Sequence, residues 1–342
     1  MIELKESAIF SFYDFGIEVK SSDPQTINNI YRDFSHFIAP SKIPEVHFEI
    51  FTSPPDYSSL PHLRPSSHSP RNFSYQSGNL LFIDYFGKGL LIFDSTKKEY
   101  KVFSAEPHLR HEIVFLTILS LVGQNFDSRK IHRVHGLGLE INGDGVLILL
   151  PQGGGKTTLM LELLKYPNVK LISEDTPLLN SSGELLPFPI RIGIDANAIK
   201  PNYPEKYLRV VKRMEFEPKY LLDIEYFQDK IAQKSCKLKF TFEGIRCLGN
   251  NSKIIPASKL RMLRGFIINS VIGLGVYQGI EFLIENGPLE LIKKSAALVS
   301  RFKNSFKAVF KTKTYFFLTG SDKNENIETF ISFFNGKSLK DL

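Results

Sequence analysis

Three glycines followed by a lysine and two threonines are the residues of this sequence best suited to chemistry. Consecutive glycines let the backbone turn tightly, so that successive N–H groups point at one anion. A lysine at the start of the following helix reaches terminal phosphates, and a threonine hydroxyl beside it is a ligand for Mg²⁺. The sequence therefore predicts a phosphate-binding loop, or P-loop, formed by Gly153, Gly154, Gly155, Lys156, Thr157 and Thr158.

The elements around this loop occur in the order that a P-loop requires. The usual pattern, G-x-x-x-x-G-K-[ST], starts with a glycine, and this chain has Leu150 there. Residues 146–150 form an unbroken apolar run, which is typical of a strand buried on both faces. Residues 158–166 carry apolar side chains at helical spacing and end before Pro167, which stops a helix. Residues 169–172 then predict a second strand.

Two acidic residues, Glu174 and Asp175, directly follow this second strand. Ligands bind at the carboxyl ends of the strands in an α/β sheet, so we expect Asp175 to face the same crevice as Lys156. A carboxylate there is suited to take the proton from an attacking hydroxyl. The alternative interpretation is that Asp175 caps a helix or a turn.

A β-hairpin is predicted immediately before the P-loop. Residues 137–141 alternate between apolar and other side chains, and residues 142–145 read Asn-Gly-Asp-Gly, a strong tight-turn sequence. The strand that enters the P-loop follows at once. In ordinary Walker NTPases this strand more often belongs to an all-parallel core, so the hairpin is a distinguishing mark.

Taken together, the Val-His-Gly-Leu segment 134–137, the hairpin, the loop and residues 171–175 resemble the HPr serine kinase/phosphorylase family. The Gly-Lys-Thr-Thr-Leu ending of the loop is also similar to that of phosphoenolpyruvate carboxykinase, which shares this nucleotide-binding core. The resemblance covers about residues 130–200. It implies an α/β fold with a mixed β-sheet P-loop kinase core of the HPr kinase type.

The resemblance also implies roles for single residues. It places the imidazole of His135 near the phosphates and implies that Lys156 and Thr157 hold the phosphates of ATP and Mg²⁺. It further implies that Glu174 and Asp175, where the family usually has two aspartates, bind the metal and activate the substrate hydroxyl.

Arg191 stands where the family has the arginine of a Glu-Ile-Arg motif, although this chain reads Pro-Ile-Arg over 189–191. The resemblance makes Arg191 a candidate phosphate clamp, and a surface salt bridge is the other interpretation. His135 likewise has the alternative role of a structural residue at the edge of a strand. Within the loop, Gln152 and Thr158 also depart from the residues typical of the family.

These features predict an ATP-dependent kinase that transfers the γ-phosphate to a hydroxyl, most plausibly on a serine of a protein or peptide. Phosphoryl transfer depends on alignment and on positive charge around the oxygens, which Lys156, Arg191 and Mg²⁺ supply. One alternative is a kinase for a small alcohol, and another is a non-catalytic switch protein that binds ATP or GTP. A carboxykinase-like enzyme is disfavoured, because the metal-ligating histidine and lysine of that family have no clear counterpart.

Charge is concentrated near the end of the sequence. Residues 251–342 hold 14 Lys or Arg and 7 Asp or Glu, an excess equal to the net charge of +7. Such a face attracts acidic peptides, nucleic acids or anionic membranes. No aromatic-interleaved motif accompanies the charge, so we expect a solvated helical surface and no nucleic-acid partner. Residues 265–284 are apolar but contain polar residues and four glycines, which predicts a buried, broken helix and no stable membrane insertion.

The remaining sequence sets the expected organisation. Strand and helix patterns over 1–105 predict an α+β N-terminal domain, with a proline- and serine-rich surface loop over 52–71. Residues 106–342 are expected to form the nucleotide-binding domain, with a basic, mainly helical C-terminal part; residues 205–255 are poorly patterned. Two cysteines without metal-like spacing and no signal-peptide layout predict a cytoplasmic protein. HPr kinases are oligomers, which makes a homo-oligomer a further expectation.

Overall fold

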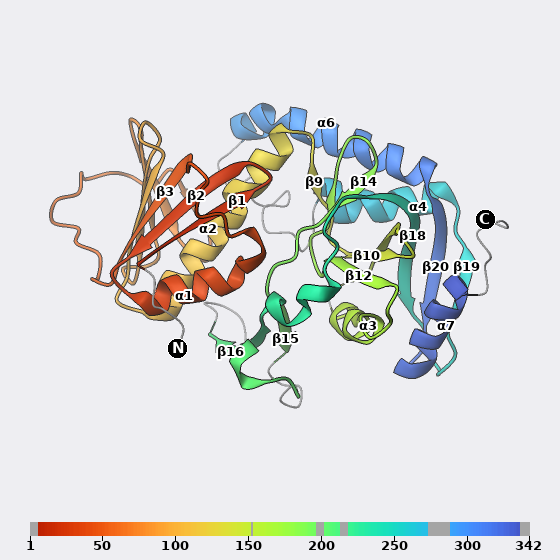
Figure 1. Ribbon diagram of the computed structural model, residues 1–342. Coiled ribbons are helices and arrows are strands. Elements are labelled where there is room, and N and C mark those ends of the chain that lie inside the picture. The colour runs from red at the N-terminus through yellow and green to blue at the C-terminus, as the bar shows by residue number, and fades with distance from the viewer. Residues whose placement is uncertain (1–5, 152, 196–201, 213–217, 273–287, 336–342) are drawn as a thin grey trace. The chain divides into compact units, whose positions relative to one another are not determined.

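The computed structural model shows a mixed α/β protein with mixed sheets (Figure 1). Packing divides the chain into two compact units. The first comprises residues 1–125, 190–226 and 282–290, and the second comprises residues 126–189, 227–281 and 291–342. The residues that the structure describes are 6–151, 153–195, 202–212, 218–272 and 288–335.

An eight-stranded sheet forms the base of the first unit, in the order β1-β2-β3-β8-β7-β6-β5-β4. Strand β3 pairs in parallel with β2 and β8, and the other pairs are antiparallel. A three-stranded sheet, β15-β17-β16, completes the unit. The strands are β1 Ser7–Phe12, β2 Phe15–Ser21, β3 Val46–Phe51, β4 Ser67–His68, β5 Phe73–Ser77, β6 Leu80–Asp84, β7 Leu90–Asp94, β8 Glu99–Phe103, β15 Ile192–Asp195, β16 Leu208–Val211 and β17 Lys219–Leu222.

The start of helix α1 in this unit is fixed by its own residues. Asp23 caps it by accepting a hydrogen bond from the Gln25 N–H at 3.1 Å, and proline occupies the first helical position. The first unit also contains most of α2. The helical elements are α1 Pro24–Asp33, η1 Ser35–Phe37, α2 Pro107–Ser128, η2 Glu205–Tyr207 and, at the boundary with the second unit, η3 Ile224–Lys230.

A nine-stranded mixed sheet organises the second unit. Strands β10 and β11 form the predicted antiparallel hairpin, β10 also pairs with β12, and β11 runs parallel to β18. Strand β18 in turn lies parallel to β20. The strands are β9 His132–Arg133, β10 Leu137–Ile141, β11 Asp144–Leu149, β12 Val169–Ser173, β13 Leu178–Leu179, β14 Glu184–Leu186, β18 Cys236–Arg246, β19 Lys253–Pro256 and β20 Lys313–Thr319.

Helices cover both faces of this sheet (Figure 1). On one face, Met262 and Phe266 of α4 and Val309 of α6 pack against Leu147 and Leu149 of β11. On the other face lie α3 and α7, which contact each other. The helices are α3 Lys156–Leu163, α4 Lys259–Phe266 with its π-helical continuation η4 Ile267–Ile272, α6 Pro288–Lys311 and α7 Lys323–Asn335. The P-loop strand therefore lies in the middle of a three-layer core.

The sequence pattern is weak or interrupted in two segments that reach into the second unit. The poorly patterned region 205–255 contains β18, an eleven-residue strand beside the P-loop strand, and alternation over 236–243 was its signal. The broken helix expected over 265–284 is helical to Ile272, and its remaining residues lie outside the described part of the chain. Within the ranges described, no helix combines the length and the apolar character needed to cross a bilayer.

Candidate functional site

The predicted P-loop connects β11 to α3 by a turn that depends on glycine. Gly153 and Gly155 have φ values of 73° and 83°, in the left-handed region that favours glycine. A Cβ at either position would meet no atom within 4 Å, so open space adjoins the turn. Gly155 is the N-cap of α3 and no described side chain caps the helix. The first-turn N–H groups of α3 are thus available to an anion.

Leu150, which replaces the first glycine of the usual pattern, is a core residue. Its side chain is 3% exposed and lies over Gly244 of β18, where a Cβ would overlap it. Leu150 and Gly244 face each other, and the space between them holds only one side chain. In this chain the side chain is that of Leu150, and the glycine is on β18. The departure at Leu150 therefore affects packing under the loop and leaves Gly153–Gly155 free to form the turn.

Three predicted residues from three segments meet beside the loop. The ammonium of Lys156 lies 3.2 Å from Asp175 Oδ1 and 3.4 Å from the Leu150 carbonyl oxygen. His135 Nε2 lies 3.2 Å from the same Asp175 oxygen and is also in hydrogen-bond contact with Lys156 Nζ. The structure thus joins the start of α3, the turn before β10 and the turn after β12 in one cluster of charged and polar groups.

Backbone contacts fix His135 in this cluster. Its N–H donates to the Asn269 carbonyl at 2.8 Å, and the Gly136 N–H donates to the Asp175 carbonyl at 3.2 Å. A Cβ at Gly136 would come within 2.9 Å of the Ile148 carbonyl oxygen, so the close approach of this segment to β11 requires glycine. Gly136 is therefore needed for the close approach of the two backbones, and His135 supplies the polar contact with Asp175 and Lys156.

The electrostatics of the cluster keep Asp175 ionised. Burial acts to raise its pKa, but the hydrogen bond to His135 and the charge of Lys156 outweigh burial and lower it. The side chain of Asp175 is 42% exposed, whereas those of Lys156 and His135 are 9% and 8% exposed. Asp175 is consequently a carboxylate on the open side of the cluster, where a ligand can reach it.

Thr157 and Glu174 form the second half of the site. The Thr157 hydroxyl donates to Glu174 Oε1 at 2.5 Å, which brings two oxygen donors together next to Lys156. Mg²⁺ at phosphate sites takes one or two protein oxygens and completes its shell with phosphate and water. The described residues contain no cluster of three acidic, histidine or cysteine side chains that would hold a metal alone. The donors present fit a magnesium ion shared with a nucleotide.

Glu243 is a further candidate that the sequence reasoning missed. It lies within β18 and pairs in register with Leu149, the last residue of β11. One of its carboxylate oxygens is buried and has no hydrogen-bond partner among the residues described. Burial raises its pKa, and the charges of Arg261 and Arg264 oppose that shift. A buried carboxylate level with the carboxyl end of β11 is suited to hydrogen bonding with a bound ligand.

Arg191, the predicted phosphate clamp, belongs to the first unit. Its guanidinium donates to Asp33 Oδ2 at 2.8 Å and lies 3.6 Å above the ring of Phe115. Arg209 and His111 bind the same carboxylate, His111 at 2.6 Å. Within its own unit Arg191 is therefore part of a buried ionic network, and its role at the phosphates stays a prediction.

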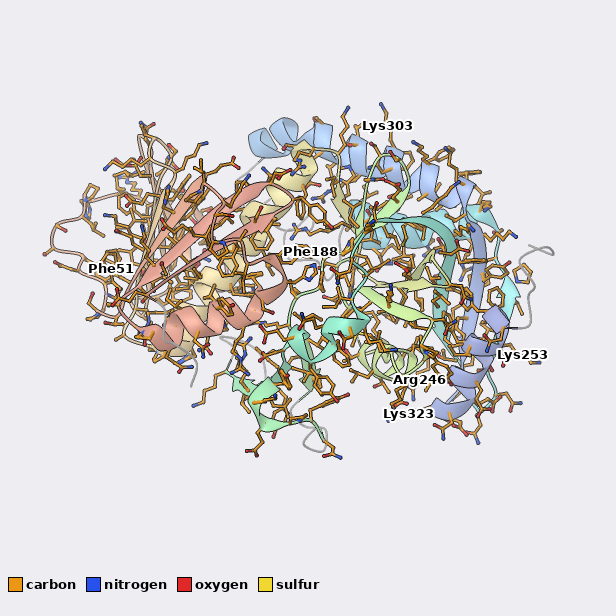
Figure 2. All side chains as sticks on the ribbon, viewed as in Figure 1. Phe51, Phe188, Arg246, Lys253, Lys303 and Lys323 are labelled. Carbon is orange, nitrogen blue, oxygen red and sulfur yellow. The ribbon has the colours of Figure 1, made fainter. Side chains whose placement is uncertain are left out.

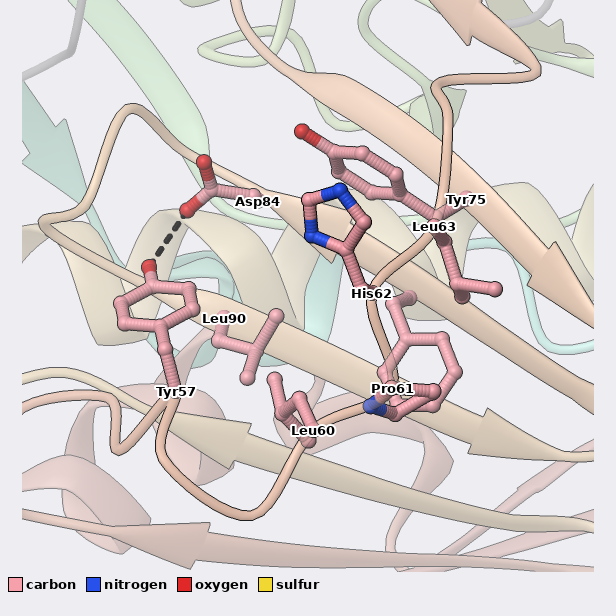
Figure 3. A pocket seen from close by; sticks show the side chains of 9 residues that line it. Tyr57, Leu60, Pro61, His62, Leu63, Tyr75, Asp84 and Leu90 are labelled. Carbon is pink, nitrogen blue, oxygen red and sulfur yellow. Dashed lines mark hydrogen bonds between the residues drawn. The ribbon is translucent and has the colours of Figure 1, made fainter.

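A separate cavity of about 270 Å³ lies in the first unit, where the proline-rich segment 52–71 folds over the sheet (Figure 3). The Tyr57 hydroxyl donates to Asp84 Oδ1 at 2.6 Å and so ties this segment to β6. The predicted site residues are absent from its lining. It is lined by Tyr57, Leu60, Pro61, His62, Leu63, Tyr75, Phe82, Asp84 and Leu90.

Comparison with known proteins leaves the interpretation to this geometry. No protein-family profile matches the chain, and no curated protein matches its sequence.

Proposed function

We propose that this protein is an ATP-dependent kinase that transfers the γ-phosphate to a hydroxyl group, with a serine of a protein or peptide as acceptor. The observation that carries the proposal is the meeting of Lys156, His135 and Asp175 at the mouth of a glycine-rich turn. A cation for phosphate and a carboxylate for a hydroxyl proton are the two groups that this reaction needs from the chain.

The loop and Lys156 bind the nucleotide in this proposal. The free N–H groups at the start of α3 take phosphate oxygens, and the Lys156 ammonium takes the terminal phosphates. Lys156 is paired with Asp175 in this structure, so phosphate oxygens compete with the carboxylate for the same ammonium. Binding of ATP thereby releases Asp175 from one of its two partners.

Asp175 then acts on the acceptor. It takes the proton of the acceptor hydroxyl as the oxygen attacks the γ-phosphorus, and the bond from that phosphorus to the bridging oxygen of ADP breaks. His135 stays hydrogen-bonded to the carboxylate and holds its orientation. Thr157 and Glu174 would hold Mg²⁺, which supplies positive charge that neutralises the phosphate oxygens when bound.

The finer fold assignment belongs to the same proposal. An antiparallel hairpin that feeds the loop, a strand after α3 that ends at two acids, and a mixed sheet support a P-loop kinase core of the HPr kinase type. The short resemblance over 130–200 points to the same core.

The test is transfer of label from γ-labelled ATP, with Mg²⁺, to acceptors in a cell lysate. We expect Lys156→Ala and Asp175→Asn to abolish transfer, while Asp175→Asn still binds ATP. Lys165→Ala and Glu328→Gln, which alter exposed side chains of the same unit, serve as matched controls and should transfer normally.

The remaining outcomes decide between the alternatives. Labelling of small molecules alone would indicate a small-alcohol kinase. ATP binding without transfer to any acceptor would contradict the kinase and favour a nucleotide-dependent switch. Absence of both binding and transfer would refute the nucleotide site itself.

A further inference from the structure

Helix α6 carries a row of exposed phenylalanines. Phe302, Phe306 and Phe310 follow one another at four-residue spacing, and their side chains are 43%, 46% and 46% exposed. Neighbouring rings contact each other, with centroids 6.5 Å and 4.4 Å apart, and Val299 extends the row by one turn at 53% exposure. Single exposed apolar residues are normal, but four in a line on one helix indicate an interaction surface.

The opposite side of the same helix segment is firmly packed on its unit. Arg301 is buried and pairs with Asp127 at 2.5 Å, and Asn304 donates to the Lys130 carbonyl at 3.0 Å. Ala308 and Val309 belong to the hydrophobic core. The orientation of the helix is thereby fixed, and the phenylalanine row faces outward because the other face is occupied. Figure 1 shows α6 along the outer edge of this unit.

A row of lysines accompanies the phenylalanines. Lys303, Lys307 and Lys311 each directly follow one ring in the sequence. Lys303 (Figure 2) and Lys311 are exposed, whereas Lys307 is half-buried and donates to the Ser181 carbonyl. Residues 291–320 contain seven Lys or Arg and no Asp or Glu. Residues 299–311 of α6, called the ridge below, therefore combine apolar rings with uniformly positive charge.

We propose that residues 299–311 of α6 dock this protein on an anionic lipid surface, with the phenylalanine rings at the acyl boundary and the lysines at the headgroups. Aromatic residues beside lysines are the pattern of helices that lie in a membrane interface. The contact is peripheral and reversible, and it is independent of the proposed kinase activity.

The charge and the residue types of the ridge favour an anionic lipid surface over a second copy of the chain or another protein. A second copy of the chain would bring two rows of lysines together, and like charges oppose such an interface. Protein hot spots are rich in Trp, Tyr and Arg seated in pockets, whereas this row offers only exposed phenylalanine rings and one valine. A fluid bilayer needs no matching pocket, and its anionic headgroups satisfy the lysines.

Co-sedimentation of the full chain with lipid vesicles tests the proposal. We expect binding to vesicles of phosphatidylcholine and phosphatidylglycerol in equal parts, weakening at high salt, and none to phosphatidylcholine alone. Changing Phe302, Phe306 and Phe310 together to Ser should reduce binding at least about tenfold, as should changing the three lysines to Glu. The matched controls are Leu248→Ser and the pair Lys253→Glu with Lys323→Glu, which should bind like wild type.

Each other outcome overturns the proposal. Absence of binding at low salt, or binding that the phenylalanine variant retains, excludes a membrane role for this row. A dimer in light scattering that the phenylalanine variant abolishes, without vesicle binding, assigns the row to a second copy. A large fall in the melting temperature of the phenylalanine variant assigns the rings to packing within the chain.

Discussion

The two units each contain an aspartate surrounded by a histidine and basic side chains, but only one of these clusters is open. Asp33 in the first unit is fully buried, and three cationic or imidazole groups bind its two oxygens. Asp175 in the second unit is 42% exposed. A closed network of this kind contributes to folding, whereas an open carboxylate beside a buried ammonium is available to a ligand.

The pKa shifts of the two aspartates have a common direction and different surroundings. Burial acts to raise the pKa of Asp33, but the charges of Arg191 and Arg209 and the hydrogen bond with His111 hold that pKa well below its usual range. The pKa of Asp175 is lowered by its hydrogen bonds with His135 and Lys156 and by their charges. A lowered pKa therefore identifies an ion pair in both places, and exposure separates a structural pair from a candidate site.

The largest expected effect comes from opening the closed network. Asp33→Ala leaves the Arg191 guanidinium without its carboxylate and removes one of the two carboxylates that Arg209 pairs with, the other being Asp223. We therefore expect the free energy of unfolding to fall by about 3–5 kcal/mol. Asp175→Asn, at a half-exposed position, should change it by less than about 1 kcal/mol. Denaturant titration of both variants measures the difference. Equal losses would mean that the two clusters have the same structural role.

The next largest effect is expected from the contact between Gly244 and Leu150, which lies beneath the open site. Gly244→Ala forces a Cβ into the Leu150 side chain, and overpacking of this kind costs about 1–3 kcal/mol. Leu150→Ala in the same chain should recover part of that loss, since the two side chains share one space. A double-mutant cycle of unfolding free energies checks this. Strict additivity would show that Leu150 and Gly244 do not face each other.

A third variant concerns Arg191, which the sequence placed at the phosphates. Arg191→Lys removes the planar group that lies over Phe115 and pairs with Asp33, so we expect a loss of about 1–2 kcal/mol in stability. The exposed Arg246→Lys is the control and should change little. If ATP affinity falls in Arg191→Lys while its stability does not, Arg191 is a phosphate clamp and not a member of a closed network.

Features that depend on neighbouring residues could be predicted from the sequence, whereas contacts between distant residues could not. The hairpin and the strand that precedes Glu174 and Asp175 were predictable, because turn residues and apolar runs act over a few residues. The pairing of Asp33 with Arg191 joins residues 158 positions apart, which no local pattern signals. Glu243 was missed because residues 205–255 are poorly patterned as a whole, although residues 236–243 within them alternate.

The smallest expected effect is a dependence on pH in the closed network. Burial is the main cause that lowers the pKa of His111, so its neutral form is favoured in the folded protein. As pH falls below about 6.5 the unfolded chain takes up this proton first, and stability decreases. Asp33 adds its loss only below about pH 4, because its folded pKa is lowered too. His36, whose pKa burial also lowers, acts in the same direction as His111.

Unfolding measured between pH 7 and pH 5 isolates the contribution of His111. We expect His111→Gln to have a flatter stability profile than wild type over this range, with His36 unchanged in both proteins. A variant profile parallel to that of wild type would show that His111 binds its proton equally in the folded and unfolded states.

Parallel measurement of ATP binding and phosphoryl transfer in Asp175→Asn tests the central claim most directly. With Mg²⁺, the variant should bind ATP at least as tightly as wild type, because Lys156 loses its competing carboxylate. Its transfer rate should fall by about 10²–10⁴-fold, the usual contribution of a general base. Transfer at the wild-type rate by a folded Asp175→Asn would contradict the account.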